Sequence, residues 1–350
     1  MSTSLSPTPV RLWYTRCGSA TASALAIQKN WLQEEFDRPG TELLSLRDSD
    51  SQELRNSHFH HGQSGMFREG GNIPPIWAKG TGKDTVVLGI TWIDEYQGIL
   101  VRADSDIHSL ADLKGKRLGI PLHDNAIIDF QRGAAQHGFQ TALAQAGLTP
   151  EDASFVDILS PAQALASGTE PQPSQRGDVI AALKAGEVDA IFIRYARGYR
   201  AAQDPELRQL LNIKDLPEPL QRVNNGTPRP ITVDRAFLER HPDVVVRYLA
   251  VLLRTANWAA SHREEVASLL LPESGGETLD DVFAAHGENV HLAFTPKLTD
   301  AYIAGLETQK NFLRDWGYLK EDFEIKDWIV REPLEQARRL VEQEGREAVA

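Results

Sequence analysis

Residues 109–120 read SLADLKGKRLGI, and this stretch decides the fold. Its first half has the spacing of a short helix, Gly115 permits a tight turn, and the apolar end is typical of a strand. The same alternation extends along the chain, and residues 85–92 (TVVLGITW) have the pattern of a strand buried on both faces. We therefore predict an α/β protein with parallel sheets, whose ligands bind at the carboxyl ends of the strands.

The length of the chain favours two lobes. A chain of 350 residues is long for one compact domain and comfortable for two. Two sheets with a crevice between them would form a hinged binding cleft. We expect residues 1–98 to form the first part of lobe I and residues 99–225 to form lobe II. Residues 226–350 would return to lobe I and supply C-terminal helices.

Further elements follow from the residue patterns. A helix over 19–36 follows a strand at 10–14, and a helix over 123–147 begins near Asp124 or Asn125. Prolines and small polar residues in 160–177 indicate an insertion or mobile loop. The remaining expected elements are strands at 43–46, 98–102, 155–159, 188–193 and 231–233, and helices at 178–185, 235–240 and 242–258.

The composition restricts the possible functions. A formal net charge of −12 argues against non-specific nucleic-acid binding, which needs clustered Lys and Arg. The single cysteine excludes an intramolecular disulfide and a Cys-based zinc site, and a lone thiol fits a reducing compartment. The sequence shows no secretory signal and no apolar stretch that would span a bilayer, so we expect a soluble cytoplasmic protein without membrane contact.

Cys17 is the first candidate for chemistry. It lies between the strand at 10–14 and the helix at 19–36, so its thiol would sit near the unpaired N–H groups of a helix N-terminus. Such a position lowers the pKa of a thiol, and Arg16 would add a nearby cation. The alternative is that Cys17 is a small buried hydrophobe, and position alone leaves both interpretations open.

The second candidate is the segment 57–75 (SHFHHGQSGMFREGGNIPP), which we interpret as a long functional loop. Arg68 offers a fork of donors to an oxyanion, and Gly70 and Gly71 let backbone N–H groups approach a ligand closely. His58 would orient or deprotonate a thiol. The alternatives are a solvated polar loop and a metal site through two histidines, although no metal-binding motif matches.

Three arginines follow the predicted strand at 188–193. The side chains would face either the cleft or the solvent, and the residues are Arg194, Arg197 and Arg200. Because charged side chains are mostly exposed, we interpret them as a surface face.

Taken together, these segments resemble the 2'-hydroxybiphenyl-2-sulfinate desulfinase family, which has the fold of the nitrate/sulfonate/taurine periplasmic-binding proteins. The resemblance implies a two-lobed, type II periplasmic-binding-protein-like α/β fold with the ligand cleft between the lobes. It covers nearly the whole chain and is carried by residues 14–17 (YTRC), 58–59 (HF), Gln63, Arg68, 70–75 (GGNIPP), 88–91 (LGIT), 112–119 (DLKGKRLG) and 186–190 (GEVDA).

The pieces of this resemblance differ in what they imply. DLKGKRLG and GEVDA occur throughout solute-binding proteins and report only the fold. The discriminating residues are Cys17 as the reacting thiol, His58 as its partner, and Arg68 with the Gly71 backbone N–H as the holder of the sulfinate oxygens. The sequence departs from the family pattern at Thr15-Arg16, where the family has Ser-Asn, at Gly18 instead of Pro, and at Asn72 instead of an acidic residue.

The activity that the resemblance implies is hydrolysis of a carbon–sulfur bond. A desulfinase of this kind releases sulfite from an aromatic or alkyl sulfinate, acts as a monomer and requires no metal or organic cofactor. Cys17 would either attack the sulfinate sulfur or donate a proton to the carbon that bears it, and both routes stay open. The alternative is a sulfonate- or taurine-type solute-binding protein of an ABC transporter, against which the missing signal peptide argues. A cytoplasmic ligand sensor and a thiamin-precursor enzyme are further options, although the cysteine-rich motif of the latter is absent.

Overall fold

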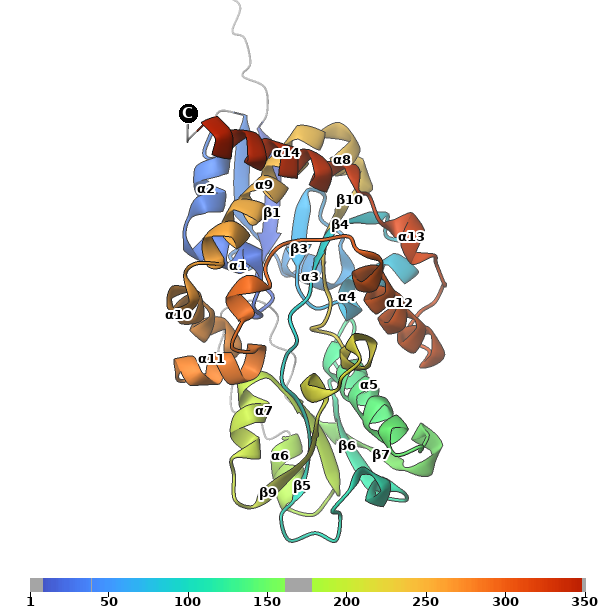
Figure 1. Cartoon of the computed structure of the whole chain (residues 1–350). Helices are drawn as coiled ribbons and strands as arrows, with labels where there is room; N and C mark the ends of the chain where they lie inside the picture. Colours follow the sequence, from blue (N-terminus) through green and yellow to red (C-terminus); the bar gives the residue numbers. More distant parts are fainter. Residues whose placement is uncertain (1–8, 39, 161–177, 348–350) are drawn as a thin grey trace, which may run out of the picture.

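The computed structural model describes residues 9–38, 40–160 and 178–347, and these form two lobes (Figure 1). We call the elements around the first sheet lobe I and those around the second sheet lobe II. The first sheet has the order β2-β1-β3-β10-β4 and the second the order β7-β6-β8-β5-β9. The strands are β1 (Val10–Thr15), β2 (Thr41–Ser45), β3 (Met66–Glu69), β4 (Thr85–Thr91), β5 (Gln97–Arg102), β6 (Arg117–Leu122), β7 (Ser154–Leu159), β8 (Ala190–Arg194), β9 (Leu207–Asn212) and β10 (Arg229–Asp234).

Helices surround both sheets. The stretch at 109–120 is a 3₁₀ helix at Leu110–Leu113, a turn at Gly115 with a φ of +72°, and β6, as its residue pattern predicts. The α-helices are α1 (Ala22–Gln28), α2 (Trp31–Phe36), α3 (Gln52–His60), α4 (Ile73–Gly80), α5 (Phe130–Gln145), α6 (Val179–Lys184), α7 (Tyr195–Ala202), α8 (Arg235–Arg240), α9 (Pro242–Ala259), α10 (Arg263–Ser274), α11 (Leu279–His286), α12 (Asp300–Asp315), α13 (Ile325–Trp328) and α14 (Glu332–Glu347).

Both sheets are mixed, so the prediction of wholly parallel sheets is wrong. β10 runs antiparallel to β3 and β4, and β5 runs antiparallel to β8 and β9. The reason is the path of the chain, which crosses between the lobes after β4 and again before β10 (Figure 1). A strand that enters its sheet from the boundary between the lobes runs away from that boundary. The parallel strands run toward it, so their carboxyl ends still face the other lobe.

Several local predictions are corrected. The segment 57–75 is not a loop, because it contains the end of α3, all of β3 and the start of α4. The helix expected over 19–36 is broken into α1 and α2 at Asn30, which has a left-handed φ of +63°. Helix α5 begins at Phe130 with Asp129 as its N-cap, and β9 was not foreseen. The loop predicted at 160–177 lies almost wholly outside the described residues.

The two lobes share a hydrophobic core. One cluster of buried side chains joins Phe59 and Ile73 of lobe I to Leu118 and Phe139 of lobe II, and Trp328 of α13 belongs to the same cluster. Burial of one such side chain stabilises the fold by about 1.5–3 kcal/mol. The packing therefore fixes the lobes against each other. No helix within the described residues is long and apolar enough to cross a membrane.

Candidate active site

Cys17 lies just beyond the carboxyl end of β1, at the edge of the first sheet that faces lobe II. β1 pairs in parallel with β3, and Thr15 is the register partner of Arg68. This pairing brings the segment after β1 alongside Gly70 and Gly71, which follow β3. The sheet register therefore gathers residues that are about fifty positions apart in the sequence.

His58 is a titratable neighbour of the thiol. Its Nε2 lies 3.8 Å from Sγ of Cys17, and its Nδ1 lies 2.5 Å from the hydroxyl oxygen of Thr15. The imidazole is buried in the last turn of α3. Thr15 therefore fixes the orientation of the ring, a role that the sequence did not reveal because Thr15 entered only as a departure from the family pattern.

Arg68 connects the other predicted residues. Its Nε donates to the carbonyl oxygen of His58 at 3.1 Å, and its Nη1 donates to the carbonyl oxygen of Gly71 at 2.7 Å. Its Nη2 has no hydrogen-bond partner within residues 9–38, 40–160 and 178–347. Arg68 as a whole is 2% exposed. It is a buried cation with a donor that remains available to a ligand.

Neighbouring side chains lie too close to Gly70 and Gly71 for a Cβ atom at either position. A Cβ on Gly70 would lie 2.2 Å from Sγ of Cys17, and a Cβ on Gly71 would lie 2.7 Å from the side-chain amide of Asn225. The backbone N–H of Gly71 faces the Cys17 sulfur closely enough to lower the pKa of the thiol. The structure thus brings together the five predicted site residues Cys17, His58, Arg68, Gly70 and Gly71.

The expected activation of Cys17 by a helix N-terminus is not found. Burial raises the pKa of the Cys17 thiol, and the nearby cation Arg68 and the Gly71 N–H only partly oppose that effect. Helix α1 begins five residues after Cys17, and its first N–H groups donate to the Glu69 carboxylate instead. The Arg16 guanidinium is paired with Glu273. The thiol is therefore neutral in this environment.

His58 is neutral as well. Burial, and secondly the positive charge of Arg68, lower the pKa of its imidazole well below the usual range. A thiolate–imidazolium pair would require a lower pKa for Cys17 and a higher pKa for His58. The pKa of Cys17 is raised and the pKa of His58 is lowered, so the pair exists as a neutral thiol and a neutral imidazole.

A buried charge cluster surrounds the site, consisting of Arg68, Glu69, Glu95, Arg194 and Arg229. Glu95 joins the lobes, because its carboxylate accepts from Nε of Arg194 at 2.6 Å and from Nη2 of Arg229 at 3.2 Å. Three cations and two carboxylates leave one positive charge in excess, and burial raises the pKa of Glu69 toward its neutral form. Uncompensated buried charge is costly, so the cluster favours an anionic ligand.

Arg194 corrects another prediction. Its side chain is 11% exposed, whereas we interpreted it as part of a surface face. Arg197 and Arg200 do lie at the surface, where they pair with Asp178 and Glu277. Burial of Arg194 depends on Glu95, which is distant in sequence and becomes its neighbour only in the folded chain.

The turn at 224–228 lies beside Gly71. Asn72 donates through Nδ2 to the carbonyl oxygens of Asn224 and Pro228, at 2.8 and 2.9 Å. The side-chain Oδ1 of Asn225 accepts from the backbone N–H of Ile73 at 2.9 Å. A carboxylate at position 72 has no hydrogen to donate to two carbonyl groups, which explains why Asn replaces the acidic residue of the family.

The other two histidines of the segment have separate partners. His61 contacts the hydroxyl of Thr232 through Nε2 at 3.3 Å, and His60 faces Glu53. Among the residues that the structure describes, no three His, Cys, Asp or Glu side chains cluster in a way that would hold a metal ion. The metal-site alternative therefore has no support from their placement.

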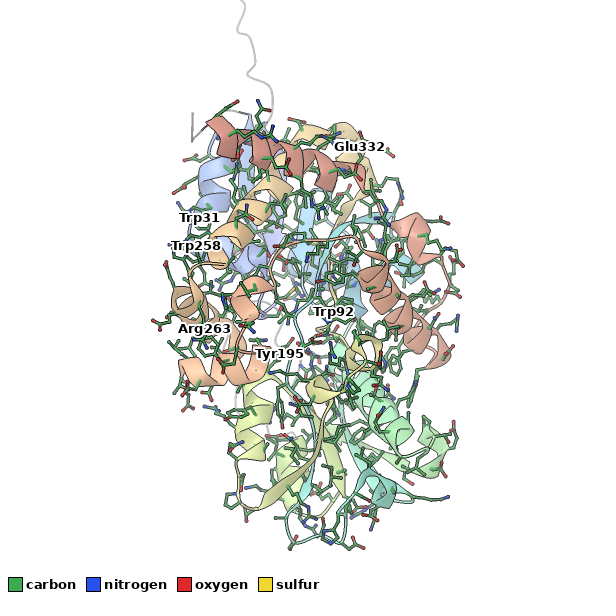
Figure 2. All side chains as sticks on the ribbon, in the orientation of Figure 1. Trp31, Trp92, Tyr195, Trp258, Arg263 and Glu332 are labelled. Atoms are coloured by element: carbon green, nitrogen blue, oxygen red, sulfur yellow. The ribbon has the colours of Figure 1, made fainter. Side chains whose placement is uncertain are left out.

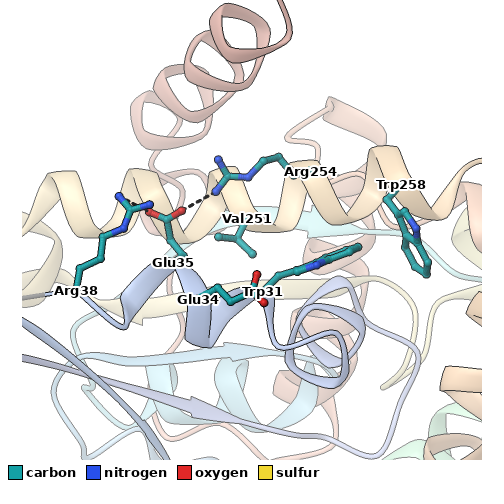
Figure 3. Close-up of a pocket in the computed structure, with 7 residues that line it drawn as sticks. All are labelled: Trp31, Glu34, Glu35, Arg38, Val251, Arg254 and Trp258. Atoms are coloured by element: carbon teal, nitrogen blue, oxygen red, sulfur yellow. Dashed lines mark hydrogen bonds and ion pairs between the residues drawn. The ribbon is translucent and has the colours of Figure 1, made fainter. Parts of the chain in front are cut away.

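Aromatic side chains mark two different regions. Trp92 and Tyr195 lie at the waist between the lobes, whereas Trp31 and Trp258 lie on the outer side of lobe I (Figure 2). The outer region contains a cavity of about 400 Å³ between α2 and α9 (Figure 3). Its carboxylate Glu35 is already paired with Arg247 and Arg254. That cavity lacks both the thiol and the uncompensated charge.

Comparison with known proteins shows which family the chain resembles. The NMT1/THI5-like family matches residues 76–266. The 2'-hydroxybiphenyl-2-sulfinate desulfinase of Rhodococcus erythropolis is 26% identical over 359 residues, which cover 92% of each chain.

Solved structures extend the comparison to three dimensions. The crystal structure of a cysteine-to-serine mutant of DSZB in complex with biphenyl-2-sulfinic acid is 25% identical, with a TM-score of 0.73 over 95% of this chain and 99% of that chain. The periplasmic aliphatic sulphonate binding protein SsuA of Escherichia coli is 19% identical, with a TM-score of 0.62 over 93% of each chain, and shares the fold. The predicted two-lobed α/β fold is thereby confirmed, and the chain belongs to the NMT1/THI5-like family as a distant homologue of the DSZB desulfinases.

Proposed function

We propose that this protein is a cysteine-dependent desulfinase that cleaves the carbon–sulfur bond of a sulfinate and releases sulfite. The observation that carries the proposal is the contact of the only thiol in the chain with His58 and the Gly71 N–H, beside the buried cation Arg68. A protein that only binds and releases a solute has no need of a thiol there. The resemblance to a desulfinase along 92% of the chain also supports the proposal.

The electrostatics of the site favour proton donation by Cys17. Both partners are neutral, because burial raises the pKa of Cys17 and lowers the pKa of His58. A neutral thiol is a proton donor, whereas the nucleophilic route needs a thiolate. In the reaction, the S–H proton would bond to the carbon that bears sulfur, using the electron pair of the carbon–sulfur bond. Sulfur dioxide would leave, and its reaction with water would give bisulfite and return a proton to the Cys17 thiolate.

Arg68 and Gly71 would hold the sulfinate oxygens. The free Nη2 of Arg68 and the N–H of Gly71 belong to two groups that both act on the thiol. The excess of positive charge in the buried cluster suits an anionic sulfinate. Charge-assisted hydrogen bonds to such an anion are about twice as strong as neutral ones.

Sulfite release from a panel of aryl and alkyl sulfinates tests the proposal. We expect turnover of at least one sulfinate, and we expect Cys17→Ser to reduce kcat by about 1,000-fold or more while ligand binding measured by calorimetry is retained. The matched control is Ser64→Ala, which alters an exposed hydroxyl of the same lobe. Undiminished turnover by Cys17→Ser would contradict an enzymatic role of the thiol.

The second candidate function is sulfonate binding. The two-lobed fold and the excess positive charge of the buried cluster both favour it, and SsuA shares the fold. Tight binding of alkanesulfonates without sulfite release from any sulfinate would establish this function in place of the first. The Cys17→Ser variant would then bind as well as the parent protein.

A further inference from the structure

Ser19 carries a buried hydroxyl group next to the candidate active site, and no step proposed above uses it. The residue is 4% exposed, and its Oγ makes no hydrogen bond in the described part of the chain. A serine hydroxyl both donates and accepts hydrogen bonds, and burial without a partner costs free energy. Such a group calls for an explanation, and a ligand that arrives from outside the chain supplies one.

The two hydroxyl groups that follow Ser19 in the sequence have partners at the start of α1. Oγ1 of Thr21 accepts from the backbone N–H of Ala24 at 3.1 Å, and Oγ of Ser23 donates to Oγ1 of Thr21 at 3.2 Å. Thr21 is the N-cap of this helix. Ser19 precedes the cap, so the helix gives no reason for its hydroxyl.

Gly70 shows how close Ser19 lies to the thiol. A Cβ built on Gly70 would lie 3.8 Å from Oγ of Ser19 and would collide with Sγ of Cys17. The sulfur and the hydroxyl oxygen therefore lie around the same point beside the Gly70 backbone. Gly18 separates the two residues and has a left-handed φ of +59°, and this turn lets both side chains face Gly70.

The backbone next to Ser19 is held by the buried charge cluster. Nη1 of Arg229 donates to the carbonyl oxygen of Ala20 at 2.5 Å, and Arg229 has no exposed surface. Nη2 of the same guanidinium donates to the Glu95 carboxylate at 3.2 Å. The hydroxyl is therefore presented at a fixed place beside the thiol, as a group that positions a substrate must be.

We propose that the Ser19 hydroxyl donates a hydrogen bond to an oxygen of the bound sulfinate, as a third holder of the anion beside Arg68 and Gly71. This inference rests on the proposed desulfinase function. A sulfinate must lie against Sγ of Cys17 to receive its proton, and Ser19 lies around the same point. The bound anion would then supply the acceptor that the hydroxyl lacks among the described residues.

The direction of charge movement decides which kinetic constant depends on Ser19. During the proposed proton transfer, negative charge leaves the sulfinate oxygens and moves to the Cys17 sulfur, because sulfur dioxide is neutral and the thiol becomes a thiolate. A donor to the sulfinate oxygens therefore stabilises the bound substrate at least as much as the transition state. Loss of the Ser19 hydroxyl should raise KM and leave kcat nearly unchanged.

Ser19→Ala tests the inference through binding and stability, which should change in opposite directions. KM for the best sulfinate of the panel, and Kd for benzenesulfinate measured by calorimetry, should rise about tenfold or more, while kcat changes less than about threefold. The urea midpoint of the free variant should equal or exceed that of the parent protein, because an unpaired buried hydroxyl is removed. The control Ser23→Ala removes a buried hydroxyl that is paired, so it should lower the midpoint and leave KM unchanged.

The two proposals fail in different ways. Unchanged KM and Kd in Ser19→Ala, with sulfite still released, would overturn the role of Ser19 and leave the desulfinase function intact. A fall in kcat at constant KM, or a urea midpoint below that of the parent protein, would also overturn this role. If the parent protein binds benzenesulfinate but releases no sulfite from any sulfinate, the desulfinase function fails, and the ratio of Kd values decides the inference. A parent protein that neither binds nor cleaves a sulfinate would overturn both proposals.

Discussion

The carboxyl edges of the two sheets face the same boundary but are built differently. At the edge of the first sheet, Cys17 and Gly70 are so close that a single methyl group would not fit between them. At the edge of the second sheet, His123 is held by one carboxylate and keeps a nitrogen without a partner among the described residues. The difference is that the first edge has no room for a methyl group at Gly70, whereas the second edge leaves an imidazole nitrogen available for a hydrogen bond.

Adding one methyl group at Gly70, at the edge of the first sheet, should have the largest effect on activity. In Gly70→Ala the new Cβ would lie 2.2 Å from Sγ of Cys17, so we expect kcat/KM for sulfite release to fall by about 100-fold or more. Gly82→Ala is the control, because Gly82 has a φ of +89° and nothing lies within 4 Å of its added Cβ. A Gly70→Ala variant with the activity of the control would show that this edge tolerates displacement.

A smaller loss should follow from replacing the fork of Arg68. Arg68→Lys keeps the positive charge but loses the paired donors to His58 and Gly71, so we expect kcat/KM to fall about 10- to 100-fold, mainly through KM. The control Arg117→Lys changes an exposed ion pair with Asp189 in lobe II. If steady-state kinetics gave equal values for both variants, the geometry of the guanidinium would be unimportant and charge alone would suffice.

Both lobes should lose stability in acid, because each contains a buried neutral histidine. Burial lowers the pKa of His61 in lobe I to about 3 and the pKa of His137 in lobe II to about 4. Between the ordinary pKa of about 6.5 and these values, the unfolded chain binds protons that the folded chain does not. The free energy of unfolding should therefore fall as the pH drops below 6.5, toward pH 3.

Urea unfolding at pH 7.5, 5.5 and 4.5 measures this slope. His137→Gln removes one contributing group and should flatten the slope, whereas exchange of the exposed His108 should not. A slope that is the same in the parent protein and His137→Gln would contradict the assignment.

The smallest expected effect concerns the hydroxyl of Thr15. Thr15→Val removes the hydrogen bond to Nδ1 of His58, and we expect kcat to fall about threefold to tenfold with little change in KM. Thr15→Ser restores the hydroxyl and should restore kcat. The pH profile of kcat distinguishes a positioning role from a packing role, because only the former shifts when the hydroxyl is lost. An unshifted profile with reduced kcat would indicate packing alone.

The sequence was a good guide to which residues meet and a poor guide to their electrostatics. Cys17, His58, Arg68 and Gly71 were predicted as one set, and the register of β1 with β3 brings them together. The position of Cys17 left open whether its thiol is activated, and the structure speaks against activation by a helix N-terminus, because burial by residues far away along the chain raises the pKa of the thiol. Local patterns report helices, turns and strands but carry no information on the surroundings of a buried thiol.

Strand direction and long-range polar contacts were also beyond the reach of local patterns. β10 and β5 are antiparallel because the chain crosses between the lobes twice, which no apolar period records. The pairing of Glu95 with Arg194 joins residues 99 positions apart. Asn72 is the exception, because its departure from the family pattern was visible in the sequence and only the reason was missing.

The core shared by the lobes has a mechanical consequence. Separation of the lobes would expose the stacked rings of Phe59 and Phe130 to water, at about 25 cal/mol for each Å² of apolar surface. The packing of this shared cluster therefore stabilises the arrangement of the two lobes. We expect small molecules to enter and leave through local opening of the structure around these rings rather than through a large rotation of one lobe relative to the other. The rate of ligand exchange would then be limited by the rate of this local opening.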